Sequence, residues 1–392
     1  MVSPSAAPLI LITDGWLANA GDAASYVATT RSLQQALPGA RVAISAHHRA
    51  LVGHLYPELD LVPPLDALTG SSWTWTTDKD LAERDVIERV VAAADLVVAT
   101  GGGYLLERYK PEGRICGYEY LLEQGKRLVF FSQSVGKFRD PDLGARLRRV
   151  LEAAELVLVR DQASLDVVTE QRDAEGVHLT ADEAFLFPSV RRVARPRSLM
   201  VTPSPHSWER GGDNELPDES FVPEVAAALR RILSSGLVRT VTLASTAQGL
   251  GGPTWALDDD SVVSEAILAA VPAHWRSRIA VRRGYLTPWQ YAALAAEHTA
   301  LISMRMHGAI LATTARTPAV MANASDKALE LRRRTERGIM GIADRSEIAK
   351  LDELVAPLLE DPGPARLRQN ASVEQMRTLA RANAKLVAEQ LQ

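Results

Sequence analysis

The sequence predicts an α/β protein built from two Rossmann-like, doubly wound domains that face each other across a cleft. The chain has 392 residues, which is more than one hydrophobic core usually supports. Short apolar runs alternate with helical patterns, and this alternation is typical of βα units and parallel sheets. It is interrupted once, at the arginine- and proline-containing segment 191–197, and then resumes. The segment therefore predicts a linker between two domains.

The individual elements follow from this alternation. In the first half, strands are expected at residues 9–13, 41–45, 96–100, 127–132 and 156–160, with helices at 23–37, 81–94 and 143–155. In the second half, strands are expected at 199–202, 238–244, 279–281, 300–303 and 318–321, with helices at 219–234, 261–271 and 288–297. The predicted domains are residues 1–190 and 198–365. Residues 366–392, rich in Ala, Arg, Gln and Leu, form a helix that we expect to pack back on the first domain.

Composition narrows the function classes. Hydrophobic residues make up 46% and charged residues 23% of the chain, and the net charge is −4. Because no large cationic field is present, nucleic acid is not expected as a partner. No uninterrupted apolar stretch is long enough to cross a bilayer, and no signal peptide is recognisable, so a cytoplasmic location is expected. The single cysteine, Cys116, excludes an internal disulfide framework and a multi-cysteine metal site.

In doubly wound sheets, ligands bind beyond the carboxyl ends of the strands, so residues that directly follow strands are the candidates for a site. Asn19, Gly21 and Asp22 follow the first strand. Gly21 permits close approach of the backbone, and Asp22 is suited to cap the next helix. A ligand-facing helix start and a simple turn with a capped helix both explain this motif.

Three glycines, Gly101, Gly102 and Gly103, follow a buried strand. Their backbone N–H groups have no Cβ beside them, so an anion cradle is one interpretation and a tight turn is the other. The spacing fits neither the dinucleotide-binding fingerprint nor the P-loop. Ser134 offers a hydroxyl group after the following strand.

Arg160 ends another predicted strand, and Asp161 after it is expected to cap a helix. A guanidinium group at this position can bind a carboxylate or phosphate, or it can form a structural ion pair. Asp182 falls in a further loop that follows a strand.

The most informative motif is Arg305, Met306, His307 and Gly308, which follows the apolar strand predicted at 300–303. An arginine can hold an anion, and an imidazole beside it can donate or accept a proton near neutral pH. Both residues lie at a strand-to-helix junction, so we expect them to face the cleft. Loops 203–217 and 248–260 also follow strands and are candidates to contact an acceptor.

Together these motifs resemble the polysaccharide pyruvyltransferase family. The matching stretches, in chain order, are N-x-G-D at 19–22, the glycine run at 101–103, the S-Q-S-V-G loop at 132–136, V-R-D-x-x-S at 159–164, D-x-A-F at 182–185, and R-x-H at 305–307 followed by a T-P-A-V strand and Lys327. The series spans most of the chain. The family often has Leu between the Arg and His, where this chain has Met306, and often has an aromatic residue before the lysine, where this chain has residues 323–326.

The resemblance implies a fold similar to GT-B glycosyltransferases and phosphoenolpyruvate as the donor. It also implies a product in which two acceptor hydroxyls hold pyruvate as a cyclic ketal, with release of phosphate. Arg160, Arg305 and His307 match the residues that the family ties to donor binding and catalysis. No metal or redox cofactor is expected, since the reaction needs neither.

Two other functions fit the sequence. A GT-B glycosyltransferase that uses a nucleotide sugar would have the same architecture, and fold alone does not separate it from a pyruvyltransferase. A catalytically inactive protein that binds a glycan or metabolite is the third, although the intact Arg305 and His307 pair argues against it. The acceptor, its attachment to lipid, and the oligomeric state are not encoded in any motif we recognise.

Overall fold

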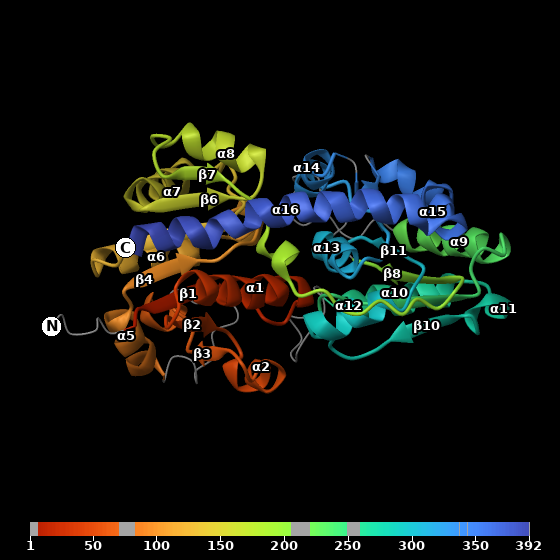
Figure 1. Cartoon of the computed structure of the whole chain (residues 1–392), viewed down its shortest axis with the longest axis horizontal. Helices are drawn as coiled ribbons and strands as arrows, with labels where there is room; N and C mark the ends of the chain where they lie inside the picture. The colour runs from red at the N-terminus through yellow and green to blue at the C-terminus, as the bar shows by residue number, and fades with distance from the viewer. Residues whose placement is uncertain are drawn as a thin grey trace. The chain divides into compact units, whose positions relative to one another are not determined.

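The computed structural model describes residues 7–69, 83–204, 220–248, 259–336, 338–342 and 344–391. They form two compact units (Figure 1). The first consists of Met1–Leu17, Asp22–Leu186 and Arg377–Gln392, and the second consists of Ala18–Gly21 and Phe187–Met376. Each unit contains one parallel sheet with helices between its strands. The predicted class, two Rossmann-like α/β domains, is confirmed.

The first unit alternates strands and helices from its first strand onward. Its elements are β1 Leu9–Gly15, α1 Ala20–Ala36, β2 Arg41–Ala46, α2 Arg49–Leu55, β3 Asp60–Val62, α3 Asp66–Thr69, α5 Arg84–Ala93, β4 Leu96–Ala99, η1 Glu107–Tyr109, α6 Glu112–Glu123, β5 Leu128–Gln133, α7 Pro141–Ala153, β6 Leu156–Val159, α8 Gln162–Thr169, β7 Val177–Leu179 and η2 Glu183–Leu186.

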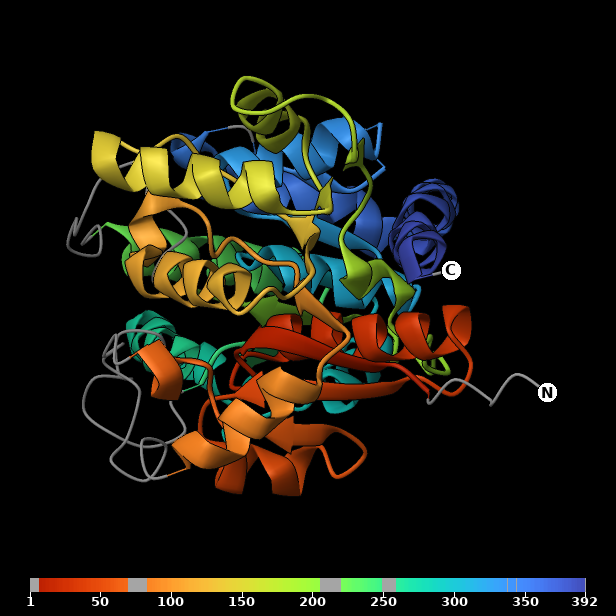
Figure 2. The same ribbon diagram turned by 90° about the vertical axis from the view of Figure 1, so that its left-hand side faces the viewer.

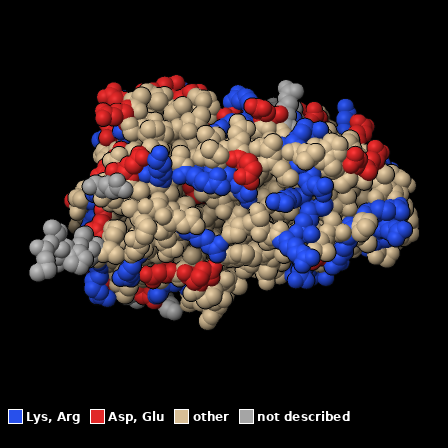
Figure 3. Space-filling view, viewed as in Figure 1, with Lys and Arg blue, Asp and Glu red and all other residues tan. Residues whose placement is uncertain are grey.

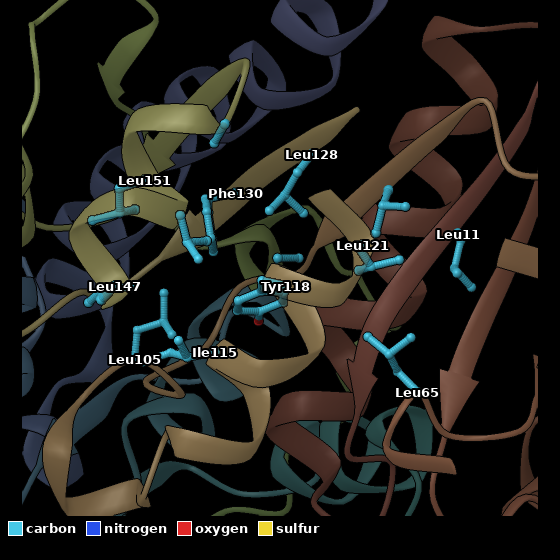
Figure 4. Packing of buried hydrophobic residues seen from close by; sticks show 14 of the residues in the cluster. Leu11, Leu65, Leu105, Ile115, Tyr118, Leu121, Leu128, Phe130, Leu147 and Leu151 are labelled. Carbon is cyan, nitrogen blue, oxygen red and sulfur yellow. The ribbon is translucent and has the colours of Figure 1, made fainter. Parts of the chain in front are cut away.

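One hydrophobic core of the first unit lies between the sheet and helices α5, α6 and α7. Buried side chains from these helices form one cluster with inward-facing residues of β1, β4, β5 and β6 (Figure 4). Tyr118 of α6 packs edge-on against Phe130 of β5, with ring centroids 5.2 Å apart and planes at 85°. In Figure 2, α1 (red) and the last turns of α16 (blue) lie together on one side of this unit.

The second unit repeats the alternation. Its elements are β8 Ser198–Thr202, α9 Phe221–Ser234, β9 Thr240–Ala244, α10 Asp260–Ala270, α11 Ala273–Arg276, β10 Ile279–Arg282, α12 Pro288–Ala296, β11 Ala300–Ser303, α13 Met306–Thr314, β12 Ala319–Met321, α14 Asp326–Arg334, β13 Met340–Gly341, η4 Arg345–Lys350, α15 Leu351–Glu360 and α16 Pro362–Leu391, the last of which continues into the first unit.

The two sheets share one winding pattern. The strand order is β3-β2-β1-β4-β5-β6-β7 in the first and β10-β9-β8-β11-β12-β13 in the second. In both, the chain starts at a central strand, winds outward in one direction, returns to the centre and winds the other way. The reversal leaves a crevice at the carboxyl ends of the two central strands, where such sheets bind ligands. Candidate sites therefore lie at the exits of β1 and β4 and at the exits of β8 and β11.

The division of the chain differs from the predicted boundaries. The first unit gives way to the second at Leu186 and Phe187, before segment 191–197. That segment is bound to the second unit through its backbone, since Val193 N donates to Ala296 O (3.2 Å) and Arg195 N donates to Glu297 O (2.7 Å). The C-terminal helix begins earlier than expected and divides between the units at Met376 and Arg377.

Candidate functional site

The glycine run after β4 packs against the loop that follows β5. A Cβ added to Gly101 would lie 2.6 Å from the carbonyl oxygen of Ser132, and one added to Gly102 would overlap the ring of Tyr104. Ser134 N donates to Gly102 O (2.9 Å), and Leu106 N donates to Gly103 O (3.1 Å). Glycine is thus needed here because two loops pack closely at the carboxyl edge of the first sheet. An anion cradle at this edge stays a prediction.

Arg160 and Asp182 form a buried ion pair in the first unit. Nη1 of Arg160 donates to Oδ2 of Asp182 (2.6 Å), and the side chains are only 5% and 6% exposed. Nε of Arg160 donates to Oγ of Ser134 (2.8 Å). Oδ1 of Asp182 accepts from Oγ of Ser25 on α1 (3.4 Å) and from Ala184 N (2.9 Å). Of the two interpretations of Arg160, the structure contains the ion pair, and a role in donor binding stays a prediction.

Asp161 caps α8, as the sequence predicts. Its Oδ1 accepts from the backbone N of Ser164 (2.8 Å), and its Oδ2 accepts from Oγ of Ser134 (2.6 Å). Ser164 in turn accepts from Val135 N (2.8 Å). Ser134, Asp161 and Arg160 are therefore connected, so the S-Q-S-V-G loop at 132–136 and the V-R-D-x-x-S motif form one hydrogen-bonded assembly.

The predicted capping role of Asp22 is wrong. Helix α1 begins at Ala20, so Asp22 lies within the first turn, and Oδ1 of Asn19 accepts from the backbone N of Gly21 (2.8 Å) instead. The side chain of Asn19, two residues before Gly21, caps the first turn, so the helix starts earlier than the charged Asp22 predicts. Asp22 lies near the Tyr104 hydroxyl, whose pKa is raised well above its usual range, first by burial and then by the Asp22 carboxylate.

In the second unit, Arg305 and His307 lie at the junction of β11 and α13, as predicted. Arg305 is the N-cap residue of α13, with extended backbone, and His307 lies in the first helical turn. The junction is held by Ser303, whose Oγ donates to Arg305 O (2.7 Å), and by Asn323, whose Nδ2 donates to Met304 O (2.8 Å). The Arg305 side chain is 20% exposed and His307 is half-buried.

Arg305 is paired with Asp260, the last residue of loop 248–260, for which the sequence predicts contact with an acceptor and no role beside Arg305. Nη2 and Nε of Arg305 donate to Oδ1 of Asp260 at 2.7 and 3.1 Å. Asp260 is fully buried at the first position of α10. Burial raises the pKa of the Asp260 carboxyl, while Arg305 and two backbone N–H groups act in the opposite direction.

The segment Ala18–Gly21 completes this cluster within the second unit. Ala20 N donates to Thr246 O (2.8 Å), and Asn19 forms an isolated antiparallel bridge with Ala247. Gly21 packs so closely on His307 that an added Cβ would lie 2.6 Å from Cγ and Nδ1 of the ring. Asn19, Gly21, Arg305 and His307, from opposite ends of the sequence, are thus brought together, whereas Asp22 belongs to the first unit.

Gly308 and Lys327 lie at the same carboxyl edge of the second sheet. A Cβ on Gly308 would lie 2.7 Å from the hydroxyl of Tyr291, which is itself 2.7 Å from Oγ1 of Thr202. Lys327 is half-buried in the first turn of α14, directly after β12. Gly308 therefore allows α13 to approach α12, and Lys327 adds a cation at the exit of the neighbouring strand.

This edge of the second sheet has the chemistry of an anion site. A guanidinium group, an imidazole and the first-turn N–H groups of α13 lie within residues 305–308, and helix N-termini attract anions. Exposed positive charge on the second unit also occurs away from this carboxyl edge. Figure 3 shows Lys and Arg gathered over the second unit on one face. Exposed Arg197, Arg239 and Arg316 directly precede β8, β9 and the β12 region, at the opposite, amino edge.

Other features of the described residues carry no site. A hollow of about 900 Å³ in the first unit is lined by Leu156 and Gly176 at the amino ends of β6 and β7, away from the motifs. No described group of three or more His, Cys, Asp or Glu could hold a metal ion. Cys116 is half-buried in α6 and accepts from Arg146 of α7 (2.9 Å). In the described ranges, no helix has the apolar length needed to cross a bilayer. Most of loops 203–217 and 248–260 lies outside the described residues.

Comparison with solved structures defines the fold first. The chain has a GT-B-like fold built from two Rossmann-like domains. Staphylococcus aureus MnaA, solved with UDP, superposes with a TM-score of 0.61 at 13% identity over 98% of this chain and 94% of that chain. The Neisseria meningitidis UDP-GlcNAc 2-epimerase bound to UDP-GlcNAc gives 0.61 at 12% identity, covering 98% and 99%. Anabaena Alr3699/HepE with UDP and glucose gives 0.61 at 13%, covering 98% and 99%.

The sequence then specifies the family. The family model for polysaccharide pyruvyl transferase matches residues 19–325. The chain therefore belongs to the polysaccharide pyruvyl transferase family, as the ordered motifs predict. A search of curated proteins finds no match.

Proposed function

We propose that the protein transfers the pyruvyl group of phosphoenolpyruvate to two hydroxyls of a sugar or sugar-like acceptor and releases phosphate. Family membership supports the transferase class and pyruvyl transfer. The observation that carries the donor assignment is the cluster of Arg305, His307 and the α13 N-terminus at the point where the second sheet reverses its winding. A small, multiply charged anion is the ligand that such a cluster suits.

The donor has a carboxylate and a phosphate on one three-carbon frame, so its site needs concentrated hydrogen-bond donors. The Arg305 guanidinium provides a planar set of N–H groups, and the first turn of α13 provides backbone N–H groups near Gly308. Lys327 adds a cation from the next strand exit. Together they would bind the anionic donor in one orientation and stabilise the negative charge that the phosphate gains as it leaves.

His307 is the proton carrier in this mechanism. As an imidazolium, it delivers a proton to the methylene carbon of the enol, which becomes a methyl group and leaves positive charge on the central carbon. One acceptor hydroxyl attacks that carbon and loses its proton. The second hydroxyl then displaces phosphate from the same carbon and closes the ketal. Atoms balance as donor plus diol giving ketal plus phosphate, with no change of oxidation state.

The test is incubation of the purified chain with phosphoenolpyruvate and a panel of glycan, lipid-linked and small sugar-like acceptors. The expected result is phosphate release that depends on the acceptor, and a product whose mass equals acceptor plus donor minus phosphoric acid. Phosphate release without that product, or the absence of both across acceptors, would contradict the proposal.

A nucleotide-sugar glycosyltransferase is the second candidate, because the structural neighbours were solved with UDP or UDP-sugars. Parallel titrations with phosphoenolpyruvate, UDP and UDP-sugars separate the two. Under our proposal, phosphoenolpyruvate binds and Arg305→Lys weakens its binding, whereas binding of UDP alone would favour the glycosyltransferase.

A further inference from the structure

The Asp260 carboxylate is the most enclosed charged group beside Arg305. It is 0% exposed, at the start of α10. Its two oxygens serve different partners. Oδ1 accepts both hydrogen bonds from Arg305, at 2.7 and 3.1 Å. Oδ2 accepts from Thr246 N (3.2 Å) and Ala247 N (3.1 Å), in the loop that follows β9. One carboxylate therefore joins α10, the β9 exit and the β11–α13 junction.

The contact with Arg305 fixes the direction of a flexible side chain. Arg305 precedes α13 with extended backbone, φ −106° and ψ 128°, so the helix does not set its orientation. Two N–H groups on one edge of the guanidinium bind the same carboxylate oxygen, which limits rotation of the guanidinium plane. Because a buried carboxylate needs a partner, the pair is also held together energetically.

The contact with the β9 exit reaches His307 as well. Thr246, which Asp260 holds through its backbone N, accepts from Ala20 N through its carbonyl oxygen (2.8 Å). Gly21, next in the chain, is the residue packed on the His307 ring. Asp260 is thus the central member of a chain of contacts that ends at both residues of the R-x-H motif.

We infer that Asp260 is a positioning residue that orients Arg305 toward the anionic donor and maintains the segment that supports His307. This inference rests on the proposed function, because it assigns Arg305 to donor binding. It adds a residue outside all of the motifs that define the family resemblance, at the end of loop 248–260, which the sequence offers only as a candidate to contact the acceptor.

Asp260→Asn tests the inference. Asn is nearly the same size but lacks the charge, and its amide nitrogen would face either the guanidinium or the backbone N–H groups. We expect kcat/KM for phosphoenolpyruvate to fall about 10–100-fold, mainly through KM, because a small displacement of a binding group is costly. The matched control is Asp352→Asn, which removes the charge from the similar edge-on pair of Arg231 and Asp352 (2.9 and 2.8 Å) in the same unit. It should leave kcat/KM unchanged.

A double-mutant cycle separates positioning from a general loss of stability. If Asp260 acts through Arg305, Asp260→Asn adds little to the loss caused by Arg305→Lys. Fully additive losses, or wild-type kcat/KM in Asp260→Asn, would overturn the inference. If Asp260→Asn does not fold, Asp260→Glu replaces it, since the longer side chain keeps the charge and displaces Arg305. Native unfolding temperature with wild-type activity in that variant would also overturn it.

Chemical labelling keeps this result distinct from failure of the proposed function. Phenylglyoxal modifies accessible guanidinium groups, and mass spectrometry reads each arginine separately. We expect Arg305 to react faster in Asp260→Asn than in the wild type, and Arg231 to react faster only in Asp352→Asn. This readout needs no turnover. A wild-type protein inactive with phosphoenolpyruvate would refute the proposed function alone, while unchanged Arg305 labelling would refute the positioning role alone.

Discussion

The two units place an arginine at the carboxyl edge of the same kind of sheet and use it differently. Arg160 in the first unit is 5% exposed and bonds to Asp182 and Ser134. Arg305 in the second unit is 20% exposed, and its Asp260 partner lies on its buried side. A position at the carboxyl edge of the sheet therefore does not by itself make an arginine a ligand-binding residue. The side of the arginine on which its carboxylate lies decides how much of the guanidinium reaches solvent.

A buried carboxylate in each unit also has different partners. Asp260 is balanced by a guanidinium group. Glu183 in the first unit is also buried, but its hydrogen-bond partners are Ser32 of α1 (3.2 Å) and Asn383 of α16 (2.9 Å). Burial raises the pKa of Glu183 to about 8, against the effect of these two hydrogen bonds. Glu183 thus connects α1 and α16 within the first unit, whereas Asp260 lies beside the candidate site of the second unit.

Among the substitutions that distinguish the two units, the largest loss of turnover is expected at His307. His307→Ala should lower turnover by about 10²–10⁴-fold if the imidazole carries the proton, with little change in the unfolding temperature. The control is His274→Ala, since His274 is exposed on α11. Wild-type turnover in His307→Ala would refute the catalytic assignment, and an equal loss in both variants would point to a nonspecific effect.

Arg160 should be decided by stability. Arg160→Ala leaves the Asp182 carboxylate buried without its cation, and we expect the free energy of unfolding to fall by roughly 3–5 kcal/mol. Chemical denaturation measures it. Arg41→Ala, which removes the exposed Arg41–Asp60 pair of the same unit (71% and 51% exposed), should cost about 0–1 kcal/mol. A small loss for Arg160→Ala together with a large loss of donor affinity would instead make Arg160 a binding residue.

Glu183 gives the first unit a pH dependence. Because its folded-state pKa of about 8 lies above the usual glutamate value of 4.5, the native state favours the protonated form. The stability contributed by this group is complete below about pH 4.5 and is lost as pH rises toward 8. The loss is at most about 1.4 kcal/mol per pH unit. Glu183→Gln should therefore be more stable than the wild type at pH 8 and lose that advantage near pH 5.

Denaturant unfolding at several pH values tests this slope. The control Glu123→Gln changes an exposed residue of α6 and should leave the slope unchanged. Parallel curves for the wild type and Glu183→Gln between pH 5 and 8 would contradict a protonated Glu183 in the folded protein.

The sequence predicted the fold well because its signal is periodic. Every expected strand is present within about two residues, since buried parallel strands are continuous apolar runs. The strands it missed, β3, β7 and β13, have two or three residues each. Such short edge strands are set by pairing with a neighbour and not by their own composition.

The site was predicted less completely for a different reason. Arg305 and His307 could be recognised because they directly follow a strand. Asp260 could not, because its burial depends on the loop after β9 and on a guanidinium that follows it by 45 positions. Likewise, no local pattern shows that Asn19, Ala20 and Gly21 contact residues 247, 246 and 307, respectively. Contacts between distant segments arise only when the chain folds.

The smallest predicted change in activity is for Gly21, which packs on His307 in the second unit. Within a helix, Gly→Ala usually stabilises by roughly 0.5–1 kcal/mol, and Gly21 lies in the first turn of α1. Here the new Cβ would overlap the His307 side chain, so we expect Gly21→Ala to lose that gain and to lower kcat/KM about tenfold through displacement of the ring. Gly144→Ala is the matched control, since a Cβ at Gly144 of α7 meets nothing within 4 Å. It should raise stability and leave activity unchanged. If Gly21→Ala behaves like Gly144→Ala in both measurements, the ring tolerates displacement and the close packing on His307 has no part in catalysis.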